Sequence, residues 1–494
     1  MGGKPFILIS LIFLILSSCQ SREENKAPVP AKAAAKVTRG CRGCHPLKID
    51  NEHDLGCTTC HGGRDNLSNL EDSHRGLIAH PAHPRQMKKN CGKCHHQTKN
   101  AASSIHFTLK KEINLVRRHF GATRDIADLT KIPLPDPPRD ILGLADDLLR
   151  RRCLRCHLYF EGDAYPATRH ATGCGACHLE YHDGKMVSHR FVTSPGDDRC
   201  LACHYGNHVG SDYYGMYEHD YKWEFRTPYQ PDGTYAKRPF GVEQHRLTPD
   251  IHKLAGISCI DCHSGSELMG PGHDKDRDKA EKTTCRTCHQ WQSGQHPPLP
   301  NLVIDKGRLY LRLKNSRQAL PVPQMKDPAH KEYGRRVACG VCHAQWSFND
   351  WGTHLIRIDE DDLEKWTDFV VQSSFEVEWQ LNQTLNNGNS EQPMMSDKIS
   401  GVLRPGIWLK GYEKRRWLPI PVGTDKSGRL RVMRPILDLH LSYVNANGEV
   451  VFDSEVAGAG KIWRPYTPHT IGPAPAFFRR RLRDNLKEFS NAKD

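Results

Sequence analysis

The sequence predicts a chain of two parts: a long N-terminal part with short helices and little regular secondary structure, packed around covalently bound groups, and a separate α+β module at the C-terminal end. Three observations predict this division. Eighteen of the 19 cysteines fall into nine copies of the unit C-x-x-C-H, and the last 149 residues contain no cysteine. Hydrophobic residues form only 37% of the chain, with a mean hydropathy of −0.65, so an aliphatic core is thin for a protein of this length.

The nine repeated units carry a specific chemistry, because C-x-x-C-H is the attachment motif of c-type haem. Two thiols three positions apart add to the two vinyl groups of one haem, and the following histidine supplies an axial (proximal) nitrogen to the iron. Roughly 0.04 such units would arise by chance in this composition, so the nine observed copies predict nine haem c groups and the haem-packed fold class of multihaem cytochromes c. In chain order, motifs 1 to 9 are Cys41, Cys44 and His45; Cys57, Cys60 and His61; Cys91, Cys94 and His95; Cys153, Cys156 and His157; Cys174, Cys177 and His178; Cys200, Cys203 and His204; Cys259, Cys262 and His263; Cys285, Cys288 and His289; and Cys339, Cys342 and His343.

Other uses of cysteine explain the pattern less well. A zinc site needs C-x-x-C pairs that converge on one metal, and a disulfide framework gives no reason for a histidine after every second cysteine. A redox-active C-x-x-C would be expected once. Between Thr38 and Gln345 the nine motifs occupy 308 residues, about 34 residues per haem, so porphyrin should supply much of the buried apolar surface.

Residues 1–18 have the features of a signal peptide. An apolar run of eleven residues follows Lys4 closely and is too short to cross a bilayer as a helix. The run ends in Leu16-Ser17-Ser18-Cys19, which resembles the lipobox of bacterial lipoproteins and implies a lipid on Cys19 after cleavage. An ordinary cleaved signal with an incidental cysteine is the alternative. Because no aspartate follows Cys19 directly, we expect an exported protein that is lipid-anchored to a bacterial membrane, with the outer membrane favoured, and that faces the periplasm or the cell surface.

The spacing of the motifs divides the rest of the chain. Residues 19–37, rich in alanine, lysine and proline, are expected to form a flexible lipid-anchored tether. Motifs 1 to 3 form a three-haem cluster in 38–120, and motifs 4 to 9 form a six-haem cluster in 142–345. The segment between them, 121–141, is rich in proline, which forbids a continuous helix and predicts a stiff connector. Residues 346–494 form the haem-free module.

Three elements are expected in the haem-free module. Residues 359–385 begin with acidic residues and then carry apolar residues at helical spacing, which predicts an amphipathic helix. Apolar and polar residues alternate over 437–443 before an Asn-Gly pair, which predicts a hairpin. The segment 478–489 places four apolar residues on one helical face amid arginines. This predicts a docking helix with a solvated basic face, and contact with lipid head groups or an acidic partner is the alternative.

The formal net charge of +13 would suit a nucleic acid or an anionic membrane as partner, but it omits the cofactors that the motifs predict. Each bis-histidine haem adds roughly −1 when ferric and −2 when ferrous once its propionates ionise, so the mature holoprotein would lie between about +3 and about −6. The chain also has no aromatic-interleaved basic patch and no nucleic-acid-binding motif. We therefore expect no nucleic-acid partner.

The sixth ligand of each iron decides between electron conduction and chemistry on a substrate. Twenty histidines remain beyond the nine in the motifs, and nine of them would suffice to close every iron as a low-spin bis-histidine haem. Histidines just before or after a motif are the candidates for distal ligands, and the alternative for each is a surface or propionate-bonded histidine. The candidates are His53, His80, His83, His106, His119, His170, His182, His189, His208, His252, His273, His296 and His330. Weaker candidates are His96, His440 and His469.

With these features the chain resembles the multihaem c-type cytochrome lipoproteins of bacterial anaerobic and extracellular respiratory chains. The resemblance rests on the lipobox, on the nine motifs between residues 41 and 343 and on the surplus of histidines. It does not extend to the four-haem cytochrome c3 module, which has longer C-x-x-x-x-C-H variants, or to typical cytochrome c nitrite reductases, which carry a C-x-x-C-K motif. The resemblance implies an electron carrier whose partners are redox proteins.

Two functions of different classes follow. The first is an electron-transfer protein that passes electrons along nine haems from a quinol-linked donor to an outer-membrane or soluble acceptor. The second is an enzyme, a multihaem reductase in which one haem keeps an open site for a small oxyanion or related molecule such as nitrite, hydroxylamine or tetrathionate. The residues identify no substrate pocket and no catalytic residue, and the surplus of histidines favours the carrier with closed irons.

Overall fold

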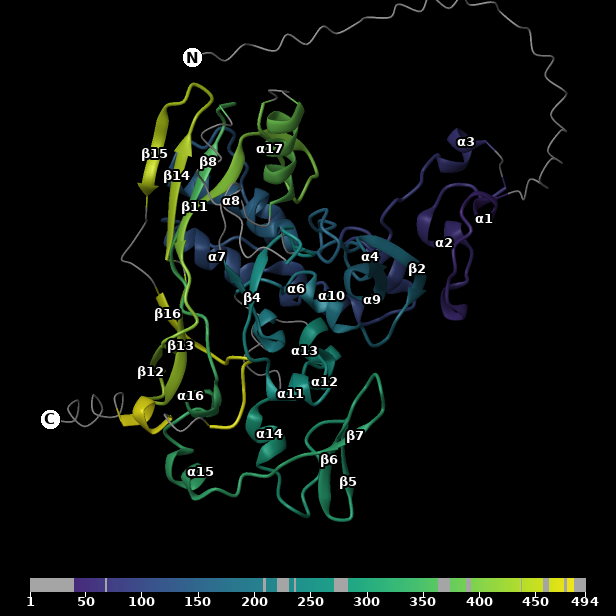
Figure 1. Ribbon diagram of the computed structural model, residues 1–494. Coiled ribbons are helices and arrows are strands. Elements are labelled where there is room, and N and C mark those ends of the chain that lie inside the picture. The colour runs from purple at the N-terminus through teal and green to yellow at the C-terminus, as the bar shows by residue number, and fades with distance from the viewer. Residues whose placement is uncertain are drawn as a thin grey trace, which may run out of the picture.

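The computed structural model describes residues 40–66, 69–207, 210–219, 231–234, 237–270, 283–362, 374–387, 392–436, 438–455, 462–474 and 478–483. The expected signal peptide, Cys19 and the tether lie outside these residues. The described part mixes helices and several small sheets, with the short helices on one side and the C-terminal sheets on the other (Figure 1). No helix in this part is long and apolar enough to cross a membrane.

Each motif overlaps one short helix, which in motif 6 ends before Cys203 and His204. A helical turn places residues i, i+3 and i+4 on one side, which brings both thiols and the histidine of a C-x-x-C-H unit together. One turn suffices for this purpose, and the motif helices have three to five residues. In chain order they are α1 (Cys41–Cys44), α2 (Cys57–His61), η2 (Cys91–Lys93), η4 (Cys153–Cys156), α9 (Gly175–His178), α10 (Asp197–Leu201), α12 (Cys259–Cys262), α14 (Cys285–His289) and α16 (Cys339–His343).

Other short helices and three small antiparallel sheets connect the motifs. The helices are η1 (Asn51–His53), α3 (Leu70–His74), α4 (Met87–Asn90), α5 (Thr98–Ala101), α6 (Ile105–Thr108), η3 (Leu129–Lys131), η5 (Ser211–Tyr214), α11 (Ile251–Leu254), α13 (Gly265–Met269) and α15 (Pro328–Tyr333). The sheets are β1 (Leu179–His182) with β2 (Lys185–Phe191), β3 (Met216–His219) with β4 (Glu243–Arg246), and β5 (Leu302–Asp305) with β6 (Arg308–Arg312) and β7 (Ala319–Pro321).

Two longer helices, α7 (Lys110–His119) and α8 (Ile141–Arg151), separate motif 3 from motif 4 in the sequence. The Asp140 side chain caps α8 by accepting a hydrogen bond from the Gly143 amide at 2.6 Å. Helix α8 ends two residues before Cys153. The packing of α8 therefore determines where motif 4 begins.

The C-terminal residues form two larger sheets. The first has the strand order β11-β8-β14-β15, in which β8 and β14 are parallel, and the second has the order β12-β13-β16. The predicted hairpin is confirmed, because β14 and β15 pair in antiparallel fashion on either side of the Asn447-Gly448 turn. The strands here are β8 (Trp351–Ile358), β9 (Met394–Ser396), β10 (Leu403–Pro405), β11 (Ile407–Lys414), β12 (Val422–Thr424), β13 (Leu430–Ile436), β14 (Leu439–Val444), β15 (Val450–Glu455) and β16 (Ile462–Tyr466).

The largest hydrophobic core joins the first C-terminal sheet to the helices that precede motif 4. Trp408 and Leu441 of the sheet pack with Leu144 and Leu148 of α8 and with Phe120, and all five side chains are almost completely buried. Burial of each large apolar side chain of this kind contributes about 2 kcal/mol to the stability of the fold. Residues on both sides of the boundary predicted at residue 346 therefore share one core.

The segment 121–141, expected as a stiff connector, is packed into the fold. Leu129 and Ile132 are buried in one cluster with Ile113 of α7 and Leu149 of α8. The structure has no continuous helix here, since α7 ends at His119 and α8 begins at Ile141, and the apolar residues of the segment pack between these two helices.

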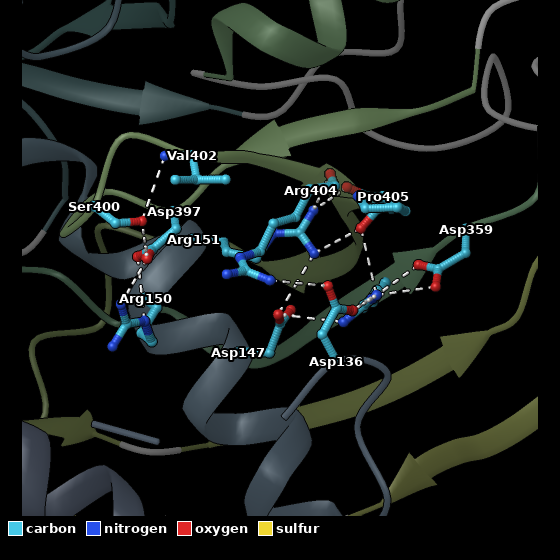
Figure 2. Close-up of polar contacts among 12 residues, drawn as sticks. Asp136, Asp147, Arg150, Arg151, Asp359, Asp397, Ser400, Val402, Arg404 and Pro405 are labelled. Atoms are coloured by element: carbon cyan, nitrogen blue, oxygen red, sulfur yellow. Dashed lines mark hydrogen bonds and ion pairs between the residues drawn. The ribbon is translucent and has the colours of Figure 1, made fainter. Parts of the chain in front are cut away.

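Buried ion pairs reinforce the contact between α8 and the C-terminal sheet (Figure 2). Asp147 of α8 lies between two guanidinium groups, with its Oδ1 3.4 Å from Arg151 and 3.2 Å from Arg357. All three side chains are completely buried. One turn further along α8, Arg150 forms a separate buried ion pair with Asp397 at 2.6 Å. Buried charges of this kind depend on their partners, because the low-dielectric interior leaves an unpaired charge without compensation.

The prediction of a helix over 359–385 is wrong for its first residues. Asp359 lies outside any helix and accepts a hydrogen bond from Arg357 Nε at 2.8 Å, residues 363–373 lie outside the described part, and α17 runs over Phe375–Asn387. At the C-terminal end, residues 478–483 are helical. Leu482 is buried there in one cluster with Val341 of motif 9, which agrees with a docking helix over its described part.

Candidate haem-binding centres

Seven of the nine motif histidines face a second histidine. In each pair the centres of the two imidazole rings lie between 5.9 and 6.4 Å apart. With the motif histidine first, the pairs are His45 with His74, His61 with His189, His95 with His53, His204 with His106, His263 with His469, His289 with His252, and His343 with His330. A further pair, His219 with His245, is closer at 4.4 Å and involves no motif.

The spacing within the seven pairs fits one iron between two imidazoles. A metal lies about 2 Å from a ligating histidine nitrogen and the ring centre lies about 1 Å behind that nitrogen, so two axial histidines on one iron have ring centres about 6 Å apart. The 4.4 Å between His219 and His245 leaves too little room for this. The residues present therefore fit bis-histidine haem at motifs 1, 2, 3, 6, 7, 8 and 9.

Hydrogen bonds at the second ring nitrogen orient these histidines. A ligating imidazole usually donates its Nδ1–H to a carbonyl or carboxylate oxygen, which fixes the ring and leaves Nε2 for the metal. Nδ1 of the motif histidines His61, His289 and His343 lies 2.9, 2.7 and 3.0 Å from a backbone carbonyl oxygen. Among the partner histidines, Nδ1 of His53 and of His252 lies 2.6 and 2.8 Å from an aspartate carboxylate. The Nε2 atoms of these rings are thus left for the iron.

Burial keeps the more enclosed of these imidazoles neutral, which is the form that binds a metal. It lowers the pKa of His204 to about 4, and it also lowers the pKa of His189 and His289. At His263 the hydrogen bond with the Glu267 carboxylate raises the pKa instead. Oε1 of Glu267 lies 3.1 Å from Nδ1 of His263 and accepts a hydrogen bond from it.

The structure brings five of the thirteen candidate distal histidines to a motif histidine: His53, His106, His189, His252 and His330. Two more, His208 and His273, lie outside the described residues. Within the described part the other six form no such pair: His80, His83, His119, His170, His182 and His296. His182 is 82% exposed at its hairpin turn. By contrast, His170 is buried, and its Nε2 lies 3.7 Å from Cys203 Sγ. The weaker candidates His96 and His440 are also unpaired with a motif histidine.

The spacing between histidines and the next motif did not predict two of the partner histidines. His74 lies 17 residues before Cys91, too far for the rule of a histidine just before the next motif. His469 was a weak candidate, because it lies in the module without cysteines. Both positions depend on packing between distant segments, so no local pattern identifies them.

Three histidine pairs cross the expected segment boundaries. His61 with His189 and His204 with His106 join the three-haem and six-haem segments. His263 with His469 joins the six-haem segment to the C-terminal module. The segments expected from motif spacing are therefore joined by histidine pairs and form one structure.

Neighbouring thiols place eight of the motifs in a row. The side chains of first cysteines interact in pairs between motifs 3 and 5, 6 and 7, and 8 and 9: Cys91 with Cys174, Cys200 with Cys259, and Cys285 with Cys339. Electrostatic contacts between thiols link the other steps: Cys41 with Cys57, Cys60 with Cys91, Cys177 with Cys200, and Cys262 with Cys288. The resulting order 1, 2, 3, 5, 6, 7, 8, 9, which we call the motif row, leads across the molecule from α1 to α16 (Figure 1). Motif 4 lies beside motif 6, where Cys203 Sγ is 2.9 Å from the Cys156 carbonyl oxygen.

Comparison with known proteins adds no family to this description. No protein-family model, no curated protein and no solved structure matches the chain. The motifs and the geometry of the histidine pairs are therefore the grounds for assigning a function.

His469 should be required to close the iron of motif 7. Replacing it with alanine removes the second imidazole from that axial position, so we expect one more high-spin haem than in the native protein, able to bind carbon monoxide, with the haem count unchanged. Electronic absorption and EPR spectra of the pure holoprotein measure this. His440→Ala, in the same module but in no such pair, is the matched control and should leave the spectra unaltered. An unaltered spectrum for His469→Ala would contradict the pairing.

Proposed function

We propose that this chain is an electron-transfer protein that carries nine covalently bound haem c groups, eight of them along the motif row. The observation that supports this most directly is the set of seven histidine pairs with ring centres between 5.9 and 6.4 Å apart. Two histidines on one iron keep it low-spin and closed, so little rearranges when an electron arrives or leaves. The interactions between the cysteines of successive motifs support a continuous path.

Bound haem supplies the one-electron chemistry, through iron that changes between the ferric and ferrous states. The chain holds each imidazole on its axis through the contacts of Nδ1. These contacts differ in charge: Glu267 places a carboxylate beside His263, whereas His289 and His343 meet neutral carbonyl groups. We therefore expect the haem potentials to differ along the row, with a further spread from the charge of neighbours that are already reduced.

The partners in this proposal are redox proteins at the two ends of the row: a quinol-linked donor and an outer-membrane or soluble acceptor. A lipid on Cys19 would hold the chain at a bacterial membrane, most simply the outer one, after export. Release of the Cys19→Ala holoprotein from the membrane fraction tests the anchor, because that residue is the one cysteine outside the motifs.

The proposal predicts nine haems that are reduced over a broad span of potential. Protein matured with a cytochrome c assembly system should exceed its polypeptide mass by nine haem masses plus the lipid. A spectroscopic reductive titration should proceed in overlapping steps, and the reduced protein should pass electrons to a soluble cytochrome. A fully matured protein with eight or fewer haems, or a reduced protein that passes no electrons to other redox proteins, would contradict the proposal.

A further inference from the structure

Motif 4 lies outside the motif row. In the row the first cysteines meet in pairs, motif 1 with 2, 3 with 5, 6 with 7 and 8 with 9. The electrostatic neighbours of Cys153, the first cysteine of motif 4, are instead Arg152, Arg155 and Cys156 of its own segment. Motif 4 meets the row at motif 6, through the contact of Cys156 with Cys203. A haem on motif 4 is therefore a side branch and not a step between two other haems.

His157 also lacks the second histidine that seven other motif histidines have. Its Nε2 atom is buried and has no hydrogen-bond partner among the described residues. Its ring stacks on Tyr159 with the ring centres 5.5 Å apart. His106, His170 and His83 interact with it electrostatically, but no described histidine forms a ring pair with it. His178 of motif 5 is unpaired too, but Cys174 and Cys177 hold motif 5 within the row. Among the nine motifs, motif 4 alone combines a side-branch position with an unpaired histidine in the described structure.

Buried polar groups gather around the second cysteine of motif 4. Tyr205 is 2% exposed, and its hydroxyl faces the Cys156 sulfur with no nitrogen or oxygen partner among the described residues. Arg155 interacts electrostatically with Tyr205 and Asp163, and its Nη1 lies 3.9 Å from Asp163 Oδ2. Arg152, 8% exposed, adds a second guanidinium group. Burying such groups is costly unless they have partners.

We propose that the haem held by motif 4 binds a small inorganic oxyanion as its sixth ligand, with Arg155 and Tyr205 as the residues that bind the anion beside the iron. The inference rests on the proposed function, since it requires motif 4 to hold a haem. An iron with one histidine accepts an external ligand where two histidines exclude it. A guanidinium group forms paired hydrogen bonds with a planar oxyanion, and the bound anion would give the Tyr205 hydroxyl an acceptor.

The side-branch position suits such a site. Motif 6 connects motif 4 to the row, so electrons can pass between the bound ligand and the row without interrupting conduction from motif 1 to motif 9. The reductase considered from the sequence and the electron carrier are then two uses of one chain, at different motifs.

The test is ligand binding to the fully oxidised holoprotein, followed by EPR and electronic absorption. We expect one high-spin haem in nine, converted to a low-spin form by cyanide and titrated by nitrite with a stoichiometry of one per protein. The double variant Cys153→Ala/Cys156→Ala should keep eight haems and lose both responses.

A milder variant separates the anion site from the folding of motif 4. Tyr205→Phe should keep nine haems and the high-spin signal, but weaken nitrite binding by about tenfold, because a buried hydrogen bond to a charged group is lost. Tyr213→Phe is the matched control: its buried hydroxyl donates to the Ile257 carbonyl at 2.6 Å, near motif 7, and nitrite affinity should not change. Equal nitrite affinity in the Tyr205 variant and the control would overturn the role of Tyr205.

Two other results would overturn the inference as a whole. Nine low-spin haems with no response to cyanide or nitrite would mean that another histidine closes the iron of motif 4, with His170 and His83, which both interact electrostatically with His157, as the alternatives. The proposed electron-transfer function would then stand unchanged. A high-spin haem that survives removal of motif 4 would place the open iron elsewhere, with motif 5 as the alternative. A haem count below nine would instead count against the proposed function.

Discussion

An electrode connected to the N-terminal end of the chain should rapidly reduce all the haems of a variant that lacks motif 4, but only the first three haems of a variant that lacks motif 5. Both variants, Cys153→Ala/Cys156→Ala and Cys174→Ala/Cys177→Ala, retain eight haem-attachment motifs. The difference follows from position in the fold. Motif 5 connects motif 3 to motif 6 through its two cysteines, whereas motif 4 branches from motif 6. Electron transfer slows steeply with distance, so a missing step in the row separates the haems on either side.

Spectroelectrochemistry of protein immobilised through the segment 19–37 would measure the fraction of haem that responds in the fast phase. We expect three of eight haems in the motif 5 variant and eight of eight in the motif 4 variant, with native protein responding completely, because three motifs precede the missing step. Fast reduction of every haem without motif 5 would reveal a second path. A large slow phase in the variant without motif 4 would place the haem of motif 4 within the row, and it would contradict the assignment of motif 4 as a side branch.

Asp147→Asn should destabilise the folded protein by about 3–5 kcal/mol, the typical cost of breaking a buried ion pair by removing one partner. The Asp147 carboxylate faces Arg151 and Arg357 and accepts a hydrogen bond from the Trp408 indole nitrogen at 2.7 Å. The neutral amide would leave two buried guanidinium groups without the negative charge that now lies beside them. Since α8 leads directly into motif 4, the same loss should loosen the position of Cys153.

The free energy of unfolding of the holoprotein in denaturant, followed by far-ultraviolet circular dichroism, measures this effect. Asp125→Asn is the control, because Asp125 pairs with Arg118 at the surface, where the two side chains are 47% and 53% exposed. Exposed pairs contribute about 0–1 kcal/mol, so the control should remain close to native stability. If Asp147→Asn lowers the free energy of unfolding no more than the control does, the remaining hydrogen bonds of Arg151 and Arg357 are sufficient to stabilise their buried charges.

The candidate site was predictable from the sequence where it is local. Both thiols and the proximal histidine of each motif lie within five consecutive residues, and one turn of helix brings them together whatever surrounds it. The hairpin at Asn447-Gly448 was predictable for the same reason, since the turn and the alternation of its strands are adjacent in the chain. The beginning of the helix expected at 359 was not, because Asp359 pairs with the buried Arg357 instead of entering a helix.

The distal side of the site was only partly predictable. His53, His252 and His330 each precede a motif closely, and each does face a motif histidine. Proximity in sequence did not always indicate which motif histidine each of them faces. His330 faces His343 of the motif that follows it, but His53 precedes motif 2 and faces His95 of motif 3. His170 has the same spacing before motif 5 as His53 has before motif 2, yet it is in no such pair among the described residues. The partner of each motif histidine is chosen by the packing of whole segments.

The sequence by itself therefore determined the nine C-x-x-C-H motifs that predict covalent haem attachment, the histidine of each motif and the one cysteine left over at position 19. Tertiary structure decided what those motifs face and in which order they stand. His263 meets His469 across about 200 residues of chain, and motif 5 follows motif 3 in the row, where sequence order would place motif 4. The physical reason is the range of the interactions. Haem attachment needs one helical turn, whereas a second ligand and a neighbouring haem come from segments brought together by the burial of side chains such as Trp408, Leu144 and Leu441 in a shared core.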